Sequence, residues 1–258
     1  MERWQAAIAT ENPRLMYLLV ELLKSLDISF IMCVPEDRRS CDAKIAITSS
    51  TEVEKAETSD PIVVEEGFEP SLLTIRLLAR LHDVDSPEYV FIGVDPGMMS
   101  GVALVAEGQP LYQTSQGSPS ATADAVLLLT HYASEIFPDS TAMVRVGAGS
   151  RLFSVLTLRE IARLIDPSDI EIVNEERTTV SSGPGANESS AIIIAGRQGR
   201  TLIQSDFQLE PKIGYIKSLK TLTRRLSRKR STIPTEKARQ VILGERNLSS
   251  ILEELSSA

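Results

Sequence analysis

Apolar and polar positions follow helical spacing in two stretches of the first 86 residues. Leucines recur every three or four positions after Asn12-Pro13 and again across residues 71–82, which predicts two amphipathic helices. Asn12 is suited to cap the first helix and Pro13 to begin it. Short apolar runs predict buried strands at residues 28–34, 44–48 and 62–64. This alternation predicts a small α/β domain of unknown role over residues 1–86.

A different order of elements begins at Tyr89. Three strand-like runs follow one another before the first helix, and strands and helices alternate after it. The predicted strands are 89–95, 101–106, 110–115, 142–146 and 170–173, and the predicted helices are 119–136, 152–165 and 188–196. This β-β-β-α-β-α-β-α order describes an antiparallel meander extended by parallel strands, a mixed sheet with the topology of an RNase H-like domain.

The last part of the chain, residues 201–258, is predicted to form a helical arm. Apolar residues from Ile213 to Leu226 fall on one helical face, and further helices are expected at residues 234–243 and from Asn247 to Leu255. No heptad repeat is long enough to predict a coiled coil. The chain is therefore expected to have three parts, residues 1–86, 89–200 and 201–258.

Charge is unevenly distributed between this arm and the rest of the chain. The net charge is −8, but the segment from Lys212 to Arg230 has eight basic residues and no acidic one, so the remainder carries −16. One interpretation is a surface that contacts nucleic-acid phosphates. The other is a solvated helix face that pairs with acidic groups of the body. The residues expected to contact phosphates are Arg224, Arg225, Arg228, Lys229 and Arg230.

Composition argues against membrane, secreted, disulfide-rich and zinc-binding classes of protein. No apolar stretch approaches the roughly 20 residues needed to cross a bilayer, and the first 15 residues lack a basic-then-apolar signal pattern, so we expect a cytoplasmic protein without a membrane partner. The only cysteines are Cys33 and Cys41, and the only histidines are His82 and His131. We therefore expect reduced thiols rather than a disulfide framework or a zinc site.

The stretch from Val90 to Gly101, VFIGVDPGMMSG, carries the first candidate for chemistry. Its β-branched run predicts a buried strand that ends on Asp95 and delivers this carboxylate to its carboxyl end. Gly97 and Gly101 lack Cβ atoms on either side of the turn, so the backbone there can approach a phosphate, a metal-bound oxygen or a neighbouring strand. The alternative is an ordinary hairpin, since Asp-Pro-Gly is also a common turn sequence.

Four segments together resemble the YqgF and RuvC group of RNase H-like nucleases. The segments are residues 91–104, the VRVG at 144–147, the IVNEERTT at 172–179 and the ESSA at 188–191. EERTT is the most specific, because it resembles the family's aspartate-glutamate-arginine-leucine-threonine-threonine box with one residue fewer. The resemblance covers residues 89–200 and implies a metal-dependent nuclease that cleaves phosphodiester bonds in structured DNA or RNA, either like a Holliday-junction resolvase or in RNA processing.

The chemistry of this reaction indicates which side chains would take part. Two Mg²⁺ (or Mn²⁺) ions can activate the attacking water and neutralise the leaving oxygen, and such ions prefer oxygen ligands. The resemblance, together with their places at the end of the first strand, just past the last strand and at a helix start, makes Asp95, Glu176 and Glu188 the candidate catalytic and metal-binding residues, with Asp95 bridging both ions. Glu175 is the alternative to Glu176, because adjacent strand residues face opposite sides. Arg177, in the same motif, is a candidate nucleic-acid contact.

Two departures from the family pattern keep other functions open. Glycine at position 147 and its neighbours stand where RuvC-type enzymes carry a glutamate, although the YqgF branch also has glycine there, and Glu188 replaces an aspartate. The fold could therefore serve as a non-catalytic nucleic-acid-binding module, with residues 175–177 as a surface strand end held by ion pairs. A phosphotransferase of the actin-like group also begins with an Asp-x-Gly turn but needs a second phosphate loop, which this chain lacks. The sequence does not indicate the oligomeric state of the protein, and a homodimer is one of the states that it allows.

Overall fold

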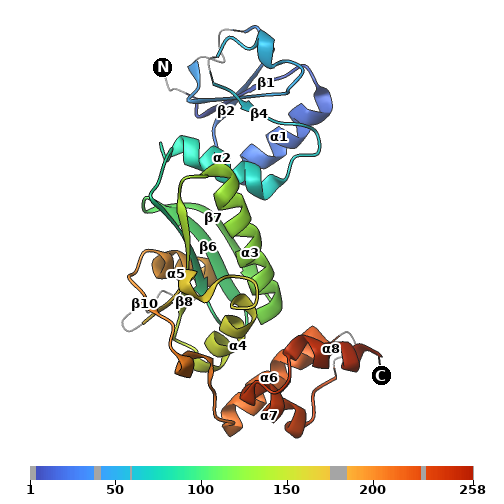
Figure 1. The fold of residues 1–258 in the computed structure, drawn as a ribbon. Helices are drawn as coiled ribbons and strands as arrows, with labels where there is room; N and C mark the ends of the chain where they lie inside the picture. Colours follow the sequence, from blue (N-terminus) through green and yellow to red (C-terminus); the bar gives the residue numbers. More distant parts are fainter. Residues whose placement is uncertain (1–3, 38–41, 59, 175–184, 228–230, 258) are drawn as a thin grey trace. The chain divides into compact units, whose positions relative to one another are not determined.

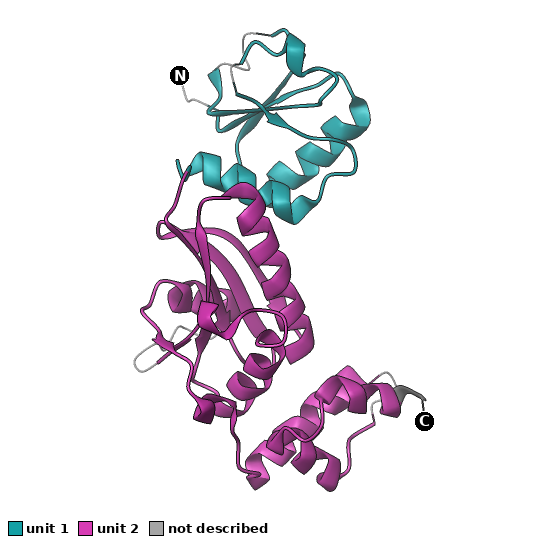
Figure 2. Cartoon of the chain, viewed as in Figure 1, with its two compact units in different colours: residues 1–85 teal, residues 86–258 magenta. Residues whose placement is uncertain are grey.

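The computed structural model describes residues 4–37, 42–58, 60–174, 185–227 and 231–257. The chain divides into two compact units, residues 1–85 and 86–258, each built on a sheet of its own (Figure 2). The described residues form one parallel sheet, one mixed sheet and eight α-helices, which places the protein in the α/β class.

The first unit is built on a four-stranded parallel sheet in the order β2-β1-β3-β4. Leucines of the two helices of this unit, residues 13–25 and 70–81, share one apolar cluster with Ile8 and Ile47 of the sheet. Asn12 caps α1 as predicted, because its side chain accepts hydrogen bonds from the backbone amides of Arg14 and Leu15. The elements are β1 (Ala6–Ala9), α1 (Pro13–Ser25), β2 (Phe30–Cys33), β3 (Ile45–Thr48), β4 (Ile62–Val63) and α2 (Pro70–Leu81).

The second unit contains a six-stranded mixed sheet in the order β10-β9-β8-β5-β6-β7. β5, β6 and β7 form an antiparallel meander, while β8 and β9 extend the sheet in parallel with β5 (Figure 1). The strands are β5 (Tyr89–Asp95), β6 (Ser100–Ala106), β7 (Gln109–Gln116), β8 (Thr141–Gly147), β9 (Ile170–Val173) and β10 (Arg200–Thr201). The helices of this part are α3 (Pro119–Ile136), α4 (Arg151–Ile161) and α5 (Ala186–Ala195).

The last three helices share an apolar core with α4. They are α6 (Ile213–Leu226), α7 (Thr235–Leu243) and α8 (Leu248–Ser257). Buried residues of α4, such as Leu152 and Leu156, belong to one cluster with Leu219 of α6, Val241 of α7 and Ile251 of α8. Packing on α4 therefore joins the helical C-terminal part to the sheet of the second unit. We call α6, α7 and α8 the helical module.

Candidate functional site

Asp95 is the last residue of β5 and lies in a row of residues that crosses three strands. It pairs with Gly101 of β6, and Gly101 pairs in turn with Ser115 of β7. Residues directly opposite each other in an antiparallel pair project to the same face of the sheet. The side chains of Asp95 and Ser115 therefore lie on one face, with the bare backbone of Gly101 between them.

Helix α5 covers this face and packs on two glycines. A Cβ atom at Gly93 would lie 2.0 Å from the carbonyl oxygen of Ala191, and one at Gly101 would lie 2.0 Å from that of Asn187. Only glycine allows a helix to approach a strand backbone this closely. Because Gly93 faces α5, strand alternation places Asp95 on the same face, close to the first turn of the helix.

Glu188 lies in the first turn of α5, where its negative charge is favoured by the helix dipole. Its carboxylate accepts a hydrogen bond from the hydroxyl of Ser115. Ser115 is two strands away from Asp95, which corresponds to about 10 Å across the sheet at the usual strand spacing. The helix thus brings Glu188 to the same face and the same end of the sheet as Asp95, while its carboxylate is directed toward β7.

The C-terminal end of α5 is held by Arg145 of β8. The guanidinium group donates hydrogen bonds to the carbonyl oxygen of Ala195 at 2.6 Å and to Glu171 of β9 at 2.8 Å. It also lies 3.6 Å from the centroid of the Phe91 ring. Both charged side chains of this ion pair are largely buried, so they fix the position of the helix rather than serve as a solvent-exposed binding group.

The third predicted ligand cannot be placed by the same reasoning. Glu176, its alternative Glu175 and the predicted contact Arg177 lie outside the described residues. The last residue of β9, Val173, pairs with Gly147 of β8, so the strand ends at the same edge of the sheet as β5. Within the described ranges, no three His, Cys, Asp or Glu residues lie close enough together to hold a metal ion.

The predicted phosphate contacts are described in part. Arg224 and Arg225 lie in the last turn of α6, whereas Arg228, Lys229 and Arg230 fall outside the described residues. Arg225 donates hydrogen bonds to the backbone carbonyls of Met98 and Gly117. At this position the basic segment contacts the core, through backbone carbonyls rather than acidic side chains.

Sequence reasoning misses Ser115 and the core contact of Arg225. Ser115 belongs to no motif, and its partner Glu188 is 73 residues away in the sequence. The sequence groups Arg225 with its basic neighbours, because the carbonyls that it contacts are 127 and 108 residues away. Only the pairing of strands and the docking of helices brings these groups together.

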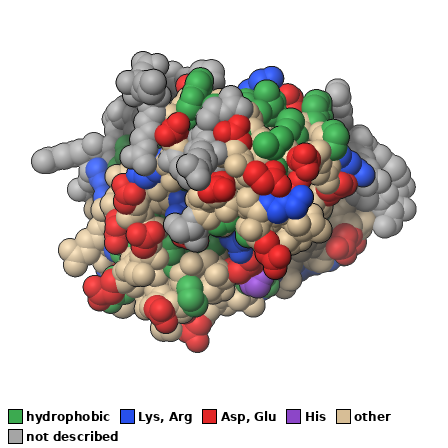
Figure 3. Space-filling view, turned by 90° about the horizontal axis from the view of Figure 1, so that it is seen from above, with side chains coloured by type: hydrophobic (Ala, Val, Ile, Leu, Met, Phe, Trp, Pro, Cys, Tyr) green, Lys and Arg blue, Asp and Glu red, His purple; other side chains and the backbone are tan. Residues whose placement is uncertain are grey.

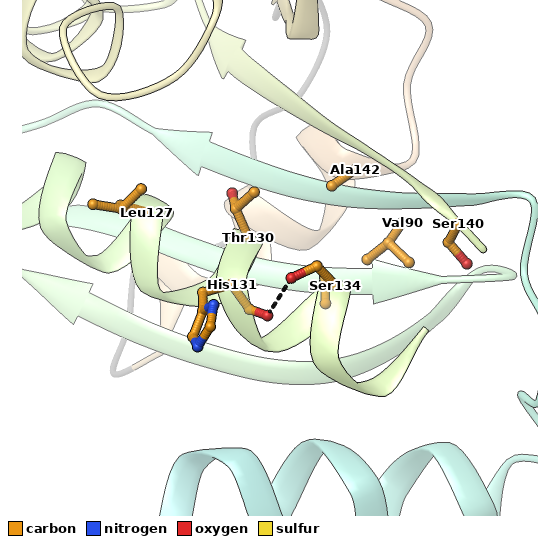
Figure 4. A pocket seen from close by; sticks show the side chains of 8 residues that line it. Val90, Leu127, Thr130, His131, Ser134, Ser140 and Ala142 are labelled. Atoms are coloured by element: carbon orange, nitrogen blue, oxygen red, sulfur yellow. Dashed lines mark hydrogen bonds between the residues drawn. The ribbon is translucent and has the colours of Figure 1, made fainter. Parts of the chain in front are cut away.

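A cavity of about 270 Å³ lies at the other end of β5, between the sheet and α3 (Figure 4). Its walls include Val90, Leu127 and Ala142, and His131 contributes from α3. The Ser134 hydroxyl donates a hydrogen bond to the carbonyl oxygen of His131 within the helix. The described residues that line this cavity include no Asp or Glu.

Outside the basic segment the sequence carries a net charge of −16. Figure 3 shows one face of the molecule on which Asp and Glu side chains are widespread. An anionic ligand therefore needs local positive charge to approach this protein.

Comparison of the sequence with models of known protein families and with curated proteins gives no match in either case. Among the described helices, none combines the length and apolar character needed to cross a membrane. Inference about function therefore depends on the residues and their geometry.

Proposed function

We propose that residues 89–200 form an RNase H-like domain of the YqgF and RuvC type and that the protein is a metal-dependent nuclease of structured DNA or RNA. The observation that carries this proposal is the contact of α5 with Gly101. It brings Glu188 to the face and end of the sheet where β5 presents Asp95. Carboxyl ends of strands are the usual place for ligands in α/β sheets.

The donor atoms at this edge suit Mg²⁺ or Mn²⁺. The carboxylates of Asp95 and Glu188 and the hydroxyl of Ser115 all offer oxygen, the ligand type that these ions prefer. Glu176 completes the proposed set of three carboxylates. Asp95, Glu188 and Glu176 would hold such ions, which would supply activation of water and stabilisation of the leaving oxygen of a phosphodiester.

The chain's own residues have separate tasks in this proposal. Asp95 would hold the metal through its carboxylate, and Glu188 would supply a second carboxylate from a helix terminus. Ser115 orients Glu188 through its hydroxyl group. Arg145 holds the opposite end of α5, so that the first turn of the helix keeps its place over Gly101.

Nucleic acid is the proposed partner because the basic residues cluster in and after α6. Apolar residues such as Leu219 and Leu222 are buried, whereas Lys217, Arg224 and Arg225 are exposed. Clustered Lys and Arg bind phosphate backbones without sequence preference. The same surface would counteract repulsion by the acidic body.

A second candidate is a non-catalytic nucleic-acid-binding module. It is favoured by the hydrogen bond between Glu188 and Ser115, which directs the Glu188 carboxylate toward β7. To share one ion with Asp95, this carboxylate has to leave Ser115 or bind through a water molecule. The two candidates differ in one property, which is metal-dependent cleavage.

Cleavage of branched DNA and of structured RNA with Mg²⁺, with Mn²⁺ and with EDTA tests the proposal. The wild-type protein should cleave only with a divalent ion, and Asp95→Asn should abolish cleavage while preserving folding and nucleic-acid binding. Asp124→Asn is the matched control, because this carboxylate is exposed on α3. Cleavage in EDTA, or undiminished cleavage by Asp95→Asn, contradicts the metal-dependent mechanism, and binding without any cleavage favours the non-catalytic module.

A further inference from the structure

Residues 96–99 connect β5 to β6 directly after Asp95; Pro96 is buried in this turn and Met99 is exposed. The amide of Gly97 lies 3.4 Å from the hydroxyl oxygen of Ser100, at the long end of the hydrogen-bonding range. Among the described residues, these four make no backbone hydrogen bond to one another. The turn is closed by the pairing of Asp95 with Gly101, and contacts from outside help to fix the conformation of the residues between them.

The helical module contacts the turn in two ways. The side chain of Met98 packs against the cluster formed by α4, α6, α7 and α8. The carbonyl oxygen of the same residue accepts a hydrogen bond from Arg225 of α6. A charged donor makes this bond stronger than one between neutral groups.

Arg225 joins this turn to a second connection. The same nitrogen, Nη2, also donates to the carbonyl oxygen of Gly117, which lies between β7 and α3. The two connections border the strand ends that carry Asp95 and Ser115, and β6 lies between these strands. Arg225 therefore spans the end of the sheet at which the candidate ligands lie.

We propose that Arg225 is a positioning residue that fixes the spacing between the Asp95 turn and the strand end carrying Ser115, the partner of Glu188. The link to metal binding rests on the proposed function, whereas the link to the turn does not. The guanidinium restrains the backbone next to Asp95 on one side. On the other side it restrains the chain two residues after Ser115.

The same contact couples the helical module to the carboxylates. Displacement of α6 moves Arg225, the donor of both hydrogen bonds. It also changes the packing of the Met98 side chain against the cluster that α6 belongs to. Nucleic acid that binds the neighbouring basic residues and displaces α6 thereby loosens the turn. Binding to the basic surface and the geometry of the candidate metal site are thereby linked.

The test compares Arg225→Ala and Arg225→Lys with Arg224→Ala. Arg224 is the matched control because it is exposed in the same turn of α6 and has no hydrogen bond or ion pair to another described residue. Backbone ¹⁵N relaxation reports on the turn whether or not metal binds. Order parameters of residues 97–99 and 117 should fall from roughly 0.85 toward 0.6 in Arg225→Ala and stay unchanged in Arg224→Ala.

Mn²⁺ binding to the full chain, followed by electron paramagnetic resonance, provides the readout that a merely structural role does not move. Arg225→Ala should weaken binding by about tenfold or more, as loss of groups that orient ligands does. Arg225→Lys should recover part of the affinity, since one nitrogen makes both hydrogen bonds. Arg224→Ala should bind Mn²⁺ like the wild type.

The outcomes separate this inference from the proposed function. Unchanged order parameters in Arg225→Ala overturn the inference, and so does a loosened turn with unchanged Mn²⁺ affinity. A wild-type protein that binds no Mn²⁺ overturns the proposed function instead. In that case the relaxation data alone decide whether Arg225 holds the turn.

Discussion

Gly101 of β6 and Asn187 of α5 are in direct backbone contact, with no room for a side chain between them. A Cβ atom at Gly101 would lie 2.0 Å from the carbonyl oxygen of Asn187 and 3.0 Å from the amide nitrogen of Glu188. Gly101 of β6 thus sets how closely α5, the helix that carries the candidate ligand Glu188, packs on the sheet. The first prediction follows from this contact.

Gly101→Ala should displace α5 and destabilise the second unit. A methyl group cannot occupy the space of a carbonyl oxygen, so the helix must move or the strand must bend. The expected loss in the free energy of unfolding is about 1–3 kcal/mol, as for overpacked cores. Chemical denaturation with urea measures it.

Gly214→Ala is the matched control for this substitution. Gly214 lies in α6, and an added Cβ would have no atom within 4 Å. Alanine also favours a helix over glycine, so this variant should be neutral or more stable by up to about 1 kcal/mol. Equal stability of the two alanine variants would contradict the close contact at Gly101.

The second prediction concerns Arg159, whose guanidinium bonds only to backbone oxygens among the residues described. It donates to the carbonyls of Val241 and Ile242 at the end of α7, and to that of Phe207. Burial lowers the pKa of Arg159, and the nearby charges of Arg163 and Arg151 lower it further. The surroundings thus disfavour the charge of Arg159, and the carbonyl oxygens of Val241, Ile242 and Phe207 are the groups that accept its hydrogen bonds.

Arg159→Met should leave these carbonyls without their donor and cost about 2–3 kcal/mol in the free energy of unfolding. Arg239→Met serves as the control, since Arg239 is exposed on α7. Circular dichroism during urea denaturation measures both variants. If Arg159→Met is no less stable than Arg239→Met, Arg159 does not hold α7 in place.

The third prediction concerns the pH dependence of the first unit. Glu52 is 9% exposed and accepts hydrogen bonds from the hydroxyls of Thr10 and Ser49 and from the amide of Glu11. Burial raises the pKa of Glu52, but these bonds and the charge of Lys55 together lower it below its ordinary value of 4.5. The folded state therefore prefers the charged carboxylate.

A carboxylate whose pKa is lower in the folded state stabilises the fold at pH values above its unfolded-state pKa. This stabilisation is lost as the pH falls through the folded-state pKa. Glu52→Gln should cost about 1–3 kcal/mol at pH 7, and its difference from the wild type should shrink below about pH 4.5. Thermal melts of both proteins between pH 3 and pH 7 provide the comparison. A stability difference that grows on acidification would contradict a lowered pKa of Glu52 in the folded state.

The fourth prediction concerns nucleic-acid binding by the basic segment. Replacing Arg224, Arg225, Arg228, Lys229 and Arg230 together by alanine should flatten the dependence of log K on log salt by several units, at about 0.9 per phosphate lost on duplex DNA. Arg224→Ala alone should flatten it by about one unit. Arg225→Ala should change it less than Arg224→Ala, because Arg225 contacts backbone carbonyls.

Titrations at several salt concentrations, together with thermal melts, separate binding from stability. An unchanged slope in the five-residue variant, with lower stability, would show that these side chains serve the core and not nucleic acid. The single variants Arg224→Ala and Arg225→Ala show which of the two side chains contacts phosphate and which contacts the core.

Much of the fold could be predicted because the hydrophobic pattern is regular. The predicted helix at 119–136 matches α3, and the strand at 89–95 matches β5. β1 escapes prediction because its sequence, Ala-Ala-Ile-Ala, is short and rich in a residue that disfavours strands. Its central place in the first sheet is set by burial between β2 and β3.

The candidate site could be predicted only in its separate parts. The end of a buried strand indicates Asp95 as a candidate, and the resemblance to the YqgF and RuvC group, together with its place at a helix start, indicates Glu188. Neither pattern contains Ser115, since its role depends on strand register and on the docking of α5. Contacts between distant segments leave no periodic signal in the sequence.

The most direct test of the central claim is a crystal structure of the full chain with Mn²⁺, in which anomalous scattering locates the ion. The account predicts anomalous density at the carboxyl end of β5, bound by Asp95 and Glu188, and its absence from Asp95→Asn crystals. Density elsewhere, or none at Asp95 at a Mn²⁺ concentration that supports cleavage, would contradict it.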